Sequence, residues 1–185
     1  MRLSISAIAL FAMAGCGDGD LVTNPNVQRW CDERPCGWAV EGEIERVGTW
    51  HTHDFGVSLV SDDARLSQLN ATASSHGGAR CFEFTMVADV DAEALVYLEL
   101  DFYDDGAVDF SQRLPPSEFE LLRFLITAPL TYEKVRFILR KTGPGRAVLA
   151  ELSAQTSYDC SAPPVVLARP DGAPCDGDLD GGPCE

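Results

Sequence analysis

The sequence predicts an all-β fold, an antiparallel β-sandwich of about eight strands held together by disulfides. Three observations lead to this prediction. Short runs rich in β-branched and aromatic residues alternate with turn signals from position 38 onward. No run with the helical period exceeds about two turns. Seven cysteines in 185 residues are many for a chain of this length, and they add the expectation of cross-links.

Turn-forming residues separate the expected strands. Asp104-Asp105-Gly106 and Thr142-Gly143-Pro144-Gly145 lie where hairpin turns would join neighbouring strands. The stretch 117–125 also fits a short helix if Ser117 caps its N-terminus, an alternative that the sequence leaves open. The eight expected strands cover residues 38–47, 54–60, 80–88, 95–103, 107–113, 121–127, 135–141 and 147–156.

Side chains two positions apart share one face of a strand, so their alternation indicates which face is buried. The run 95–103 is the clearest example, and runs 80–88 and 135–141 alternate in the same way. Its apolar set is Val96, Leu98, Leu100 and Phe102, and its polar set is Tyr97, Glu99, Asp101 and Tyr103. We therefore expect a sheet with an apolar inner face and a polar outer face.

The first sixteen residues have the three-part pattern of an export signal. A single cation, Arg2, precedes an apolar run over residues 5–14, which is too short to span about 30 Å of hydrocarbon as a helix. The run ends at Met13-Ala14-Gly15-Cys16, which resembles the bacterial lipobox, although Leu is usual in place of Met13. The alternative is an ordinary signal peptide followed by a chance cysteine.

The lipobox resemblance implies a lipoprotein. Residues 1–15 would be the signal peptide, and Cys16 would carry the lipid, palmitate included, that anchors the chain to a membrane. By resemblance to lipoprotein sorting, Gly17 stands where an Asp would retain the protein in the inner membrane. The expected location is therefore the outer membrane or the cell surface.

Composition divides the rest of the chain. Residues 16–36 are expected to be the lipidated N-terminus and a tether, because they are rich in Asp, Asn, Gly and Pro without periodicity. Residues 37–161 would form the sandwich domain, and residues 162–185 a Pro, Gly and Asp-rich tail. Removal of residues 1–15 from the 185 leaves 170, a length that fits one domain.

The chain is strongly acidic, with a formal net charge of −15 that becomes −16 when Arg2 is removed. This charge has the same sign as a nucleic-acid backbone and an anionic bilayer surface. Nucleic acid is therefore not expected as a partner, and membrane contact is expected through the lipid alone.

Six cysteines remain once Cys16 is assigned to lipid, and an exported protein folds where disulfides persist. The even number supports the lipid assignment, because no thiol is left over. Spacing favours three pairs among the connectivities that six cysteines allow. These pairs are Cys31 with Cys36, Cys81 with Cys160, and Cys175 with Cys184. The long-range bridge should contribute about 4 kcal/mol to stability in the chain-entropy model.

Two segments carry a resemblance to a known family. One is the turn 48–51 ahead of the run 55–59, and the other is the final hairpin, residues 135–141 through 147–152. With them, the stretch 38–158 resembles the galactose-binding-like jelly rolls of bacterial carbohydrate-binding modules. The resemblance implies a binding fold and says little about the ligand. Ala150-Glu151 stands where that family usually has Asp, and this departure argues against its structural calcium.

The polar set of the run 95–103 has the composition of a sugar platform. Aromatic faces stack on pyranose rings, and carboxylates accept hydrogen bonds from hydroxyl groups. The candidate ligand-binding residues are Tyr97, Glu99, Asp101, Tyr103 and Arg136. The alternative is a solvated sheet face on which the carboxylates pair with Arg136 and Arg140. Glu99 and Asp101 also have a spacing that hydrolytic carboxylate pairs use, roughly 7 Å, but nothing indicates that either pKa is raised.

Two segments resemble parts of metal sites. His51 and His53 share a strand face, but His76 is the only other histidine to complete a zinc site. Asp176, Asp178 and Asp180 match the first half of a calcium loop and lack its later bidentate acid. A solvated tail or a weak calcium site is expected there, and no other cofactor.

The sequence contains no nucleophile motif, such as a Gly-x-Ser-x-Gly elbow, that would identify a catalysed reaction. We expect a non-catalytic, surface-anchored binding domain for glycan or another cell-envelope polymer. The alternatives are a structural or assembly lipoprotein that binds a protein partner and, more weakly, a glycan-acting hydrolase. The sequence does not indicate an oligomeric state.

Overall fold

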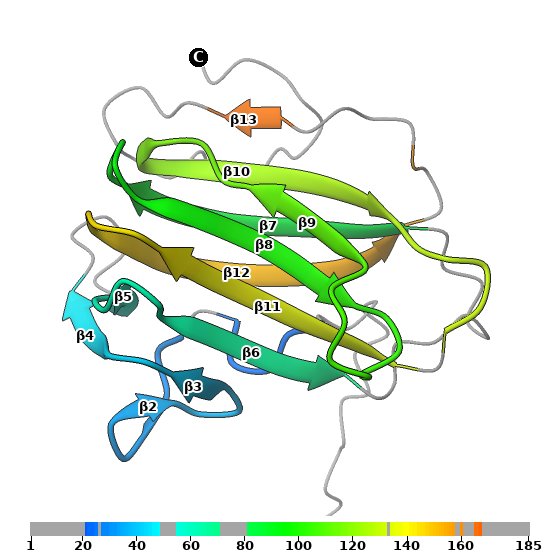
Figure 1. Ribbon diagram of the computed structural model, residues 1–185, viewed down its shortest axis with the longest axis horizontal. Coiled ribbons are helices and arrows are strands. Elements are labelled where there is room, and N and C mark those ends of the chain that lie inside the picture. The colour runs from blue at the N-terminus through cyan, green and yellow to red at the C-terminus, as the bar shows by residue number, and fades with distance from the viewer. Residues whose placement is uncertain are drawn as a thin grey trace, which may run out of the picture.

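Two antiparallel sheets lie face to face and form a sandwich (Figure 1). The computed structural model describes residues 21–25, 27–48, 55–70, 81–132, 134–157, 160 and 165–167. The six-stranded sheet has the order β13 (Val165–Leu167), β10 (Ser117–Thr127), β7 (Cys81–Val90), β12 (Ala147–Ser157), β5 (Phe55–Leu59) and β4 (Ile44–Gly48). The five-stranded sheet has the order β3 (Ala39–Glu41), β6 (Arg65–Asn70), β11 (Val135–Thr142), β8 (Leu95–Asp101) and β9 (Phe110–Arg113).

The all-β sandwich predicted from the sequence is confirmed, and the strands differ from the prediction in several places. The run 38–47 is divided into β3 and β4 by Gly42, whose φ of +77° favours glycine. Strand β6 was not predicted, because its sequence RLSQLN lacks apolar alternation. The alternative prediction of a short helix at 117–125 was wrong. Ser117 begins β10, and its hydroxyl donates to the Ala88 carbonyl instead of capping a helix.

The described part of the chain contains strands, turns and bends, and no helix in it is long and apolar enough to cross a membrane.

The core fills the space between the two sheets, as the alternation predicted. Val96, Leu98 and Leu100 of β8 are completely buried, and so are the inward side chains of β7 and β11. Phe82, Phe84 and Phe137 are also fully buried, and the Phe137 ring lies 6.1 Å from Phe82 and 5.8 Å from Phe84. These contacts between β7 and β11 join the two sheets at their centre.

The segment 21–36 is packed onto the domain, although the sequence predicted a tether there. Val22 and Val27 are 2% and 0% exposed, and buried amide side chains hold the surrounding backbone. Gln68 accepts a hydrogen bond from the Thr23 backbone and donates to the Thr23 and Gly37 carbonyls. Asn24 likewise accepts a hydrogen bond from the Arg29 backbone and donates to the Arg29 and Cys36 carbonyls. The high Asn, Gly and Pro content of this segment therefore reflects a backbone that is irregular but fixed. Its N–H and C=O groups are satisfied by side-chain amides instead of by a sheet.

Two of the three expected disulfides lie within the described residues and are confirmed. Cys31 pairs with Cys36 across the hairpin of β1 (Trp30–Cys31) and β2 (Arg34–Pro35), and Cys81 pairs with Cys160 over 79 positions. Cys16, Cys175 and Cys184 lie outside the described residues. Strand β13 falls within the stretch predicted as the tail and pairs with β10.

Candidate functional site

The candidate residues come together on the outer face of the five-stranded sheet. Strand β8 lies between β11 and β9, and the register sets Arg136 opposite Asp101 and Arg140 opposite Tyr97. Ile138, between the two arginines, is opposite Glu99. The predicted polar residues therefore lie on one side of the sheet. Its members differ widely in how accessible they are.

Asp101 organises the loop that follows β8. Its side chain is 1% exposed and accepts hydrogen bonds from the backbone of Tyr103, Asp104 and Gly106, at 3.1, 2.5 and 2.9 Å. An aspartate commonly closes a tight turn in this way. Both carboxylate oxygens are engaged, so Asp101 fixes the position of its neighbours rather than presenting a free acceptor.

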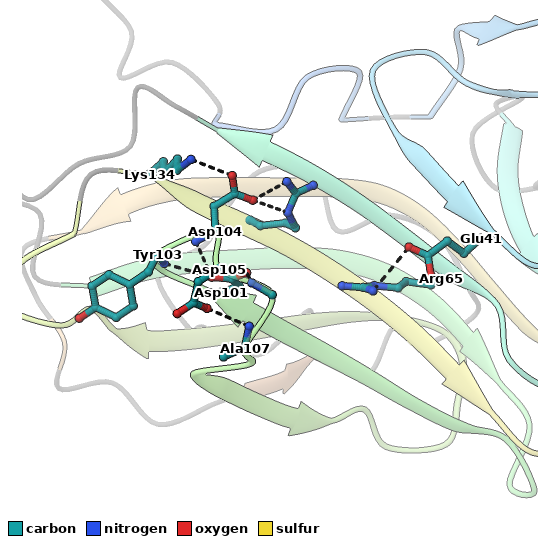
Figure 2. A network of polar contacts seen from close by, with 10 residues as sticks. Glu41, Arg65, Asp101, Tyr103, Asp104, Asp105, Ala107 and Lys134 are labelled. Atoms are coloured by element: carbon teal, nitrogen blue, oxygen red, sulfur yellow. Dashed lines mark hydrogen bonds and ion pairs between the residues drawn. The ribbon is translucent and has the colours of Figure 1, made fainter.

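Asp104, in this loop, forms ion pairs with two cationic side chains (Figure 2). It accepts a hydrogen bond from Lys134 Nζ at 2.8 Å and from the guanidinium of Arg136 through both Nε and Nη2. The hydrogen bonds from Lys134 and then Arg136 hold the pKa of Asp104 below its ordinary value. Sequence reasoning missed Asp104 as the partner of Arg136, because Asp104-Asp105-Gly106 was interpreted only as a turn.

Glu99 and Arg140 form a second ion pair on the same face. Arg140 donates to Glu99 through Nε and Nη2, at 3.1 and 2.5 Å, and Ser111 Oγ adds a contact at 3.3 Å. The Glu99 hydrogen bonds raise the pKa of Arg140 above its ordinary value. The Arg140 Cζ atom also lies 4.8 Å from the centroid of the Tyr97 ring, a cation–π distance. The side chains of Glu99, Arg140 and Tyr97 are thus mutually oriented.

The two tyrosines differ in exposure. Tyr103 is 48% exposed, and its ring projects away from the polar network (Figure 2). Tyr97 is half-buried, with Arg140 over its ring. Tyr103 is therefore the aromatic side chain of this face that is most open to a ligand.

Two further arginines belong to this face and were not predicted as site residues. Arg65 of β6 is opposite Arg140, and Arg113 of β9 is opposite Tyr97. Arg65 reaches Glu41 at 3.5 Å, a contact that Figure 2 shows at the other end of the sheet. Arg65 was missed because strand β6 was not predicted, so Arg65 could not be assigned to a sheet face.

The Glu99 and Asp101 pair lacks the environment of hydrolytic carboxylates. Each of them is already engaged, Glu99 by Arg140 and Asp101 by three backbone N–H groups. Glu99 is 4% exposed and Asp101 is 1% exposed, so neither carboxylate is open to a substrate.

No group of three or more metal-ligating side chains occurs among the described residues. The metal-ligand candidates predicted from the sequence all lie outside those residues; they are His51, His53, His76, Asp176, Asp178 and Asp180.

A separate acidic pocket of about 720 Å³ lies where β7 ends and β10 begins. Asp89, Asp91, Glu118 and Glu120 line it together with Arg146. Burial raises the pKa of Asp89, while the nearby Arg146 opposes that shift. Arg146 pairs with Asp89 at 2.5 Å, so the cationic group of this pocket is already bound.

No protein-family model and no curated protein matches the sequence. Solved structures do match. TmCBM61 in complex with β-1,4-galactotriose is similar with a TM-score of 0.57 at 12% identity, over 75% of this chain and 99% of that one. The chain has a jelly-roll fold.

Two larger structures match over part of their own length. The enzymatically active domain of tailspike protein 4 from bacteriophage CBA120 matches with a TM-score of 0.57 at 12% identity, over 75% of this chain and 21% of that one. The CBM22-1 and GH10 modules of Clostridium thermocellum xylanase 10B, complexed with xylohexaose, match with 0.53 at 10% identity, over 76% and 29%. At such identities the likeness establishes the fold.

Proposed function

We propose that this chain is a non-catalytic glycan-binding domain, and that the outer face of the five-stranded sheet is its binding surface. One observation carries the proposal. Charged side chains on this face are held by the Asp104 and Glu99 networks beside an exposed tyrosine, although none of them is needed to fill the core. Fixed polar groups around an aromatic ring are what recognition of a sugar requires.

The comparisons support the ligand class. One structure that matches over nearly its whole length is a carbohydrate-binding module with a bound galactotriose, and another match contains such a module with a xylohexaose. The carboxylate arrangement supports a non-catalytic role, since Glu99 and Asp101 act as fixed acceptors for neighbouring groups.

Each residue of the face has a distinct part in the proposed interaction. Tyr103 stacks on a sugar ring, and the half-buried Tyr97 adds a smaller apolar contact. Arg136 and Arg140 donate hydrogen bonds to hydroxyl groups, while Asp101, Asp104 and Glu99 position them. Stacking and hydrogen bonds each contribute about 1 kcal/mol, so a dissociation constant of about 10 μM to 1 mM is expected.

Tyr103→Ala should weaken glycan binding about threefold to tenfold, because it removes the stacking platform. The measurement is calorimetric titration with a glycan first identified on an array. Phe55→Ala is the matched control, since Phe55 is 38% exposed on the other sheet. Equal effects of the two variants would place the binding surface elsewhere.

We also propose that the domain is held at the outer membrane or cell surface by lipid on Cys16. The support is the lipobox-like Met13-Ala14-Gly15-Cys16 after an apolar run that is too short to span a bilayer. Cys16→Ser should abolish palmitate labelling and leave the precursor unprocessed, measured by metabolic labelling and gel mobility. Cys36→Ser is the control, and labelling that persists in Cys16→Ser contradicts the anchor.

A further inference from the structure

Three arginines lie in one row across the outer face of the five-stranded sheet. The register sets Arg65 of β6 opposite Arg140 of β11, and Arg140 opposite Tyr97 of β8. Tyr97 is in turn opposite Arg113 of β9. We call these four residues the arginine row. With neighbouring strands about 4.8 Å apart, its ends are about 14 Å apart.

The arginine row places like charges beside each other. Arg65 and Arg140 are directly opposite, an arrangement that destabilises a sheet. The charge of Arg140 is balanced by its ion pair with Glu99. The ion pair of Arg65 with Glu41 is weaker, because the two groups are 3.5 Å apart and the Glu41 side chain is 66% exposed. The buried Nε of Arg65 has no hydrogen-bond partner among the described residues.

Arg113 extends the charge to the far edge of the sheet. It is exposed, and its guanidinium forms no ion pair with any residue in the described part of the chain. The whole chain has a net charge of −15. Three arginines in one row are therefore a local concentration of positive charge on an acidic protein. Folding does not require this arrangement.

We propose that the glycan bound by this face is anionic, and that Arg65 and Arg113 bind carboxylate groups of two uronic-acid residues that are separated along one glycan chain. This inference rests on the proposed function, because it specifies the ligand of the same face. A guanidinium matches a carboxylate with two parallel hydrogen bonds, and a ligand carboxylate near Arg65 supplies the counter-charge that the row lacks. Tyr97, between the arginines, gives the sugar ring an apolar contact.

The net negative charge of the protein does not prevent such binding. At an ionic strength of 0.15 M the screening length is about 8 Å, so carboxylates elsewhere on the chain act weakly across the row. The carboxylates that act directly on the row are Glu99 and Asp63, which act on Arg140, and Glu41, which acts on Arg65. Among the described residues, Arg113 is left without an ion-pair partner. The test is therefore made at 0.15 M salt, where distant repulsion is screened.

The experiment compares a uronic-acid oligosaccharide with the same oligosaccharide after its carboxyl groups are reduced to alcohols. Both are titrated into the mature chain carrying Cys16→Ser, and then into its Arg65→Gln, Arg113→Gln and Tyr103→Ala variants. Arg34→Gln is the matched control, because Arg34 is exposed in the β1–β2 hairpin and has the same charge. We expect the acidic form to bind at least tenfold more tightly than the reduced one. Arg65→Gln and Arg113→Gln should each remove about fivefold, and Arg34→Gln nothing.

The outcomes separate this inference from the proposed function. Equal binding of the two oligosaccharides, weakened by Tyr103→Ala but not by the arginine variants, overturns the anionic ligand and keeps the glycan surface. Binding that no variant on this face changes overturns both. Circular dichroism and melting temperature of each variant establish that the fold is retained, and Arg65→Lys, which keeps the charge, should recover part of the affinity lost in Arg65→Gln.

Discussion

Phe137→Ala should lower the free energy of unfolding by about 3–5 kcal/mol. Phe137 is fully buried at the centre of the sandwich, with its ring against Phe82 and Phe84 of the facing sheet. Truncation removes apolar contacts from both sheets and leaves a cavity that neither sheet can close, because each is fixed by its own hydrogen bonds. The measurement is equilibrium denaturation in urea, followed by tryptophan fluorescence.

Leu130→Ala provides the comparison for this substitution. Leu130 is 97% exposed, so its truncation should change stability by less than about 0.5 kcal/mol. A benign Phe137→Ala would mean that the two sheets do not pack through this ring, and the arrangement of the sandwich would then be wrong.

Replacing Cys81 and Cys160 together with Ser should destabilise the protein by about 4 kcal/mol, and replacing Cys31 and Cys36 together should cost about 2 kcal/mol. The difference follows from loop length, since the first bridge spans 79 positions and the second spans 5. Cross-linking distant positions restricts the unfolded chain more. Both double variants are compared with the oxidised protein by urea denaturation without reductant.

Equal losses in the two double variants would contradict the loop-length explanation. Reduction of the unmodified protein supplies an independent check, because its stability should fall to that of a variant in which Cys31, Cys36, Cys81, Cys160, Cys175 and Cys184 are all replaced by Ser.

The strand alternation was predictable because burial on one side of a sheet forces a period of two. This was sufficient to locate the core residues of β8 and β11 and the polar face opposite them. Strand β6 escaped prediction, because Ser67 and Gln68 are buried polar residues, and the hydrogen bonds of Gln68 are made to the distant backbone of Thr23 and Gly37. Composition alone cannot reveal such partners.

The candidate site was predictable as a face but not as a set of contacts. Alternation placed Glu99, Asp101 and Arg136 together, yet the loop after β8 redirects the pairing. Asp101 closes the loop, and Asp104 at its tip takes Arg136. The φ of Asp104 is +54°, a backbone conformation that no local pattern specified. The missing information was the path of one loop.

The packing of residues 21–36 has a consequence for how the domain would be presented at a membrane. A flexible tether of some twenty residues would let the sandwich sample every orientation. The Leu21 backbone N–H donates to the Ala154 carbonyl, and Leu21 is five positions after Cys16 in the sequence. Five peptide steps extend at most about 18 Å. With lipid on Cys16, the domain would therefore be held close to the bilayer. Only part of its surface would then face away from the membrane and be accessible to soluble or surface polymers.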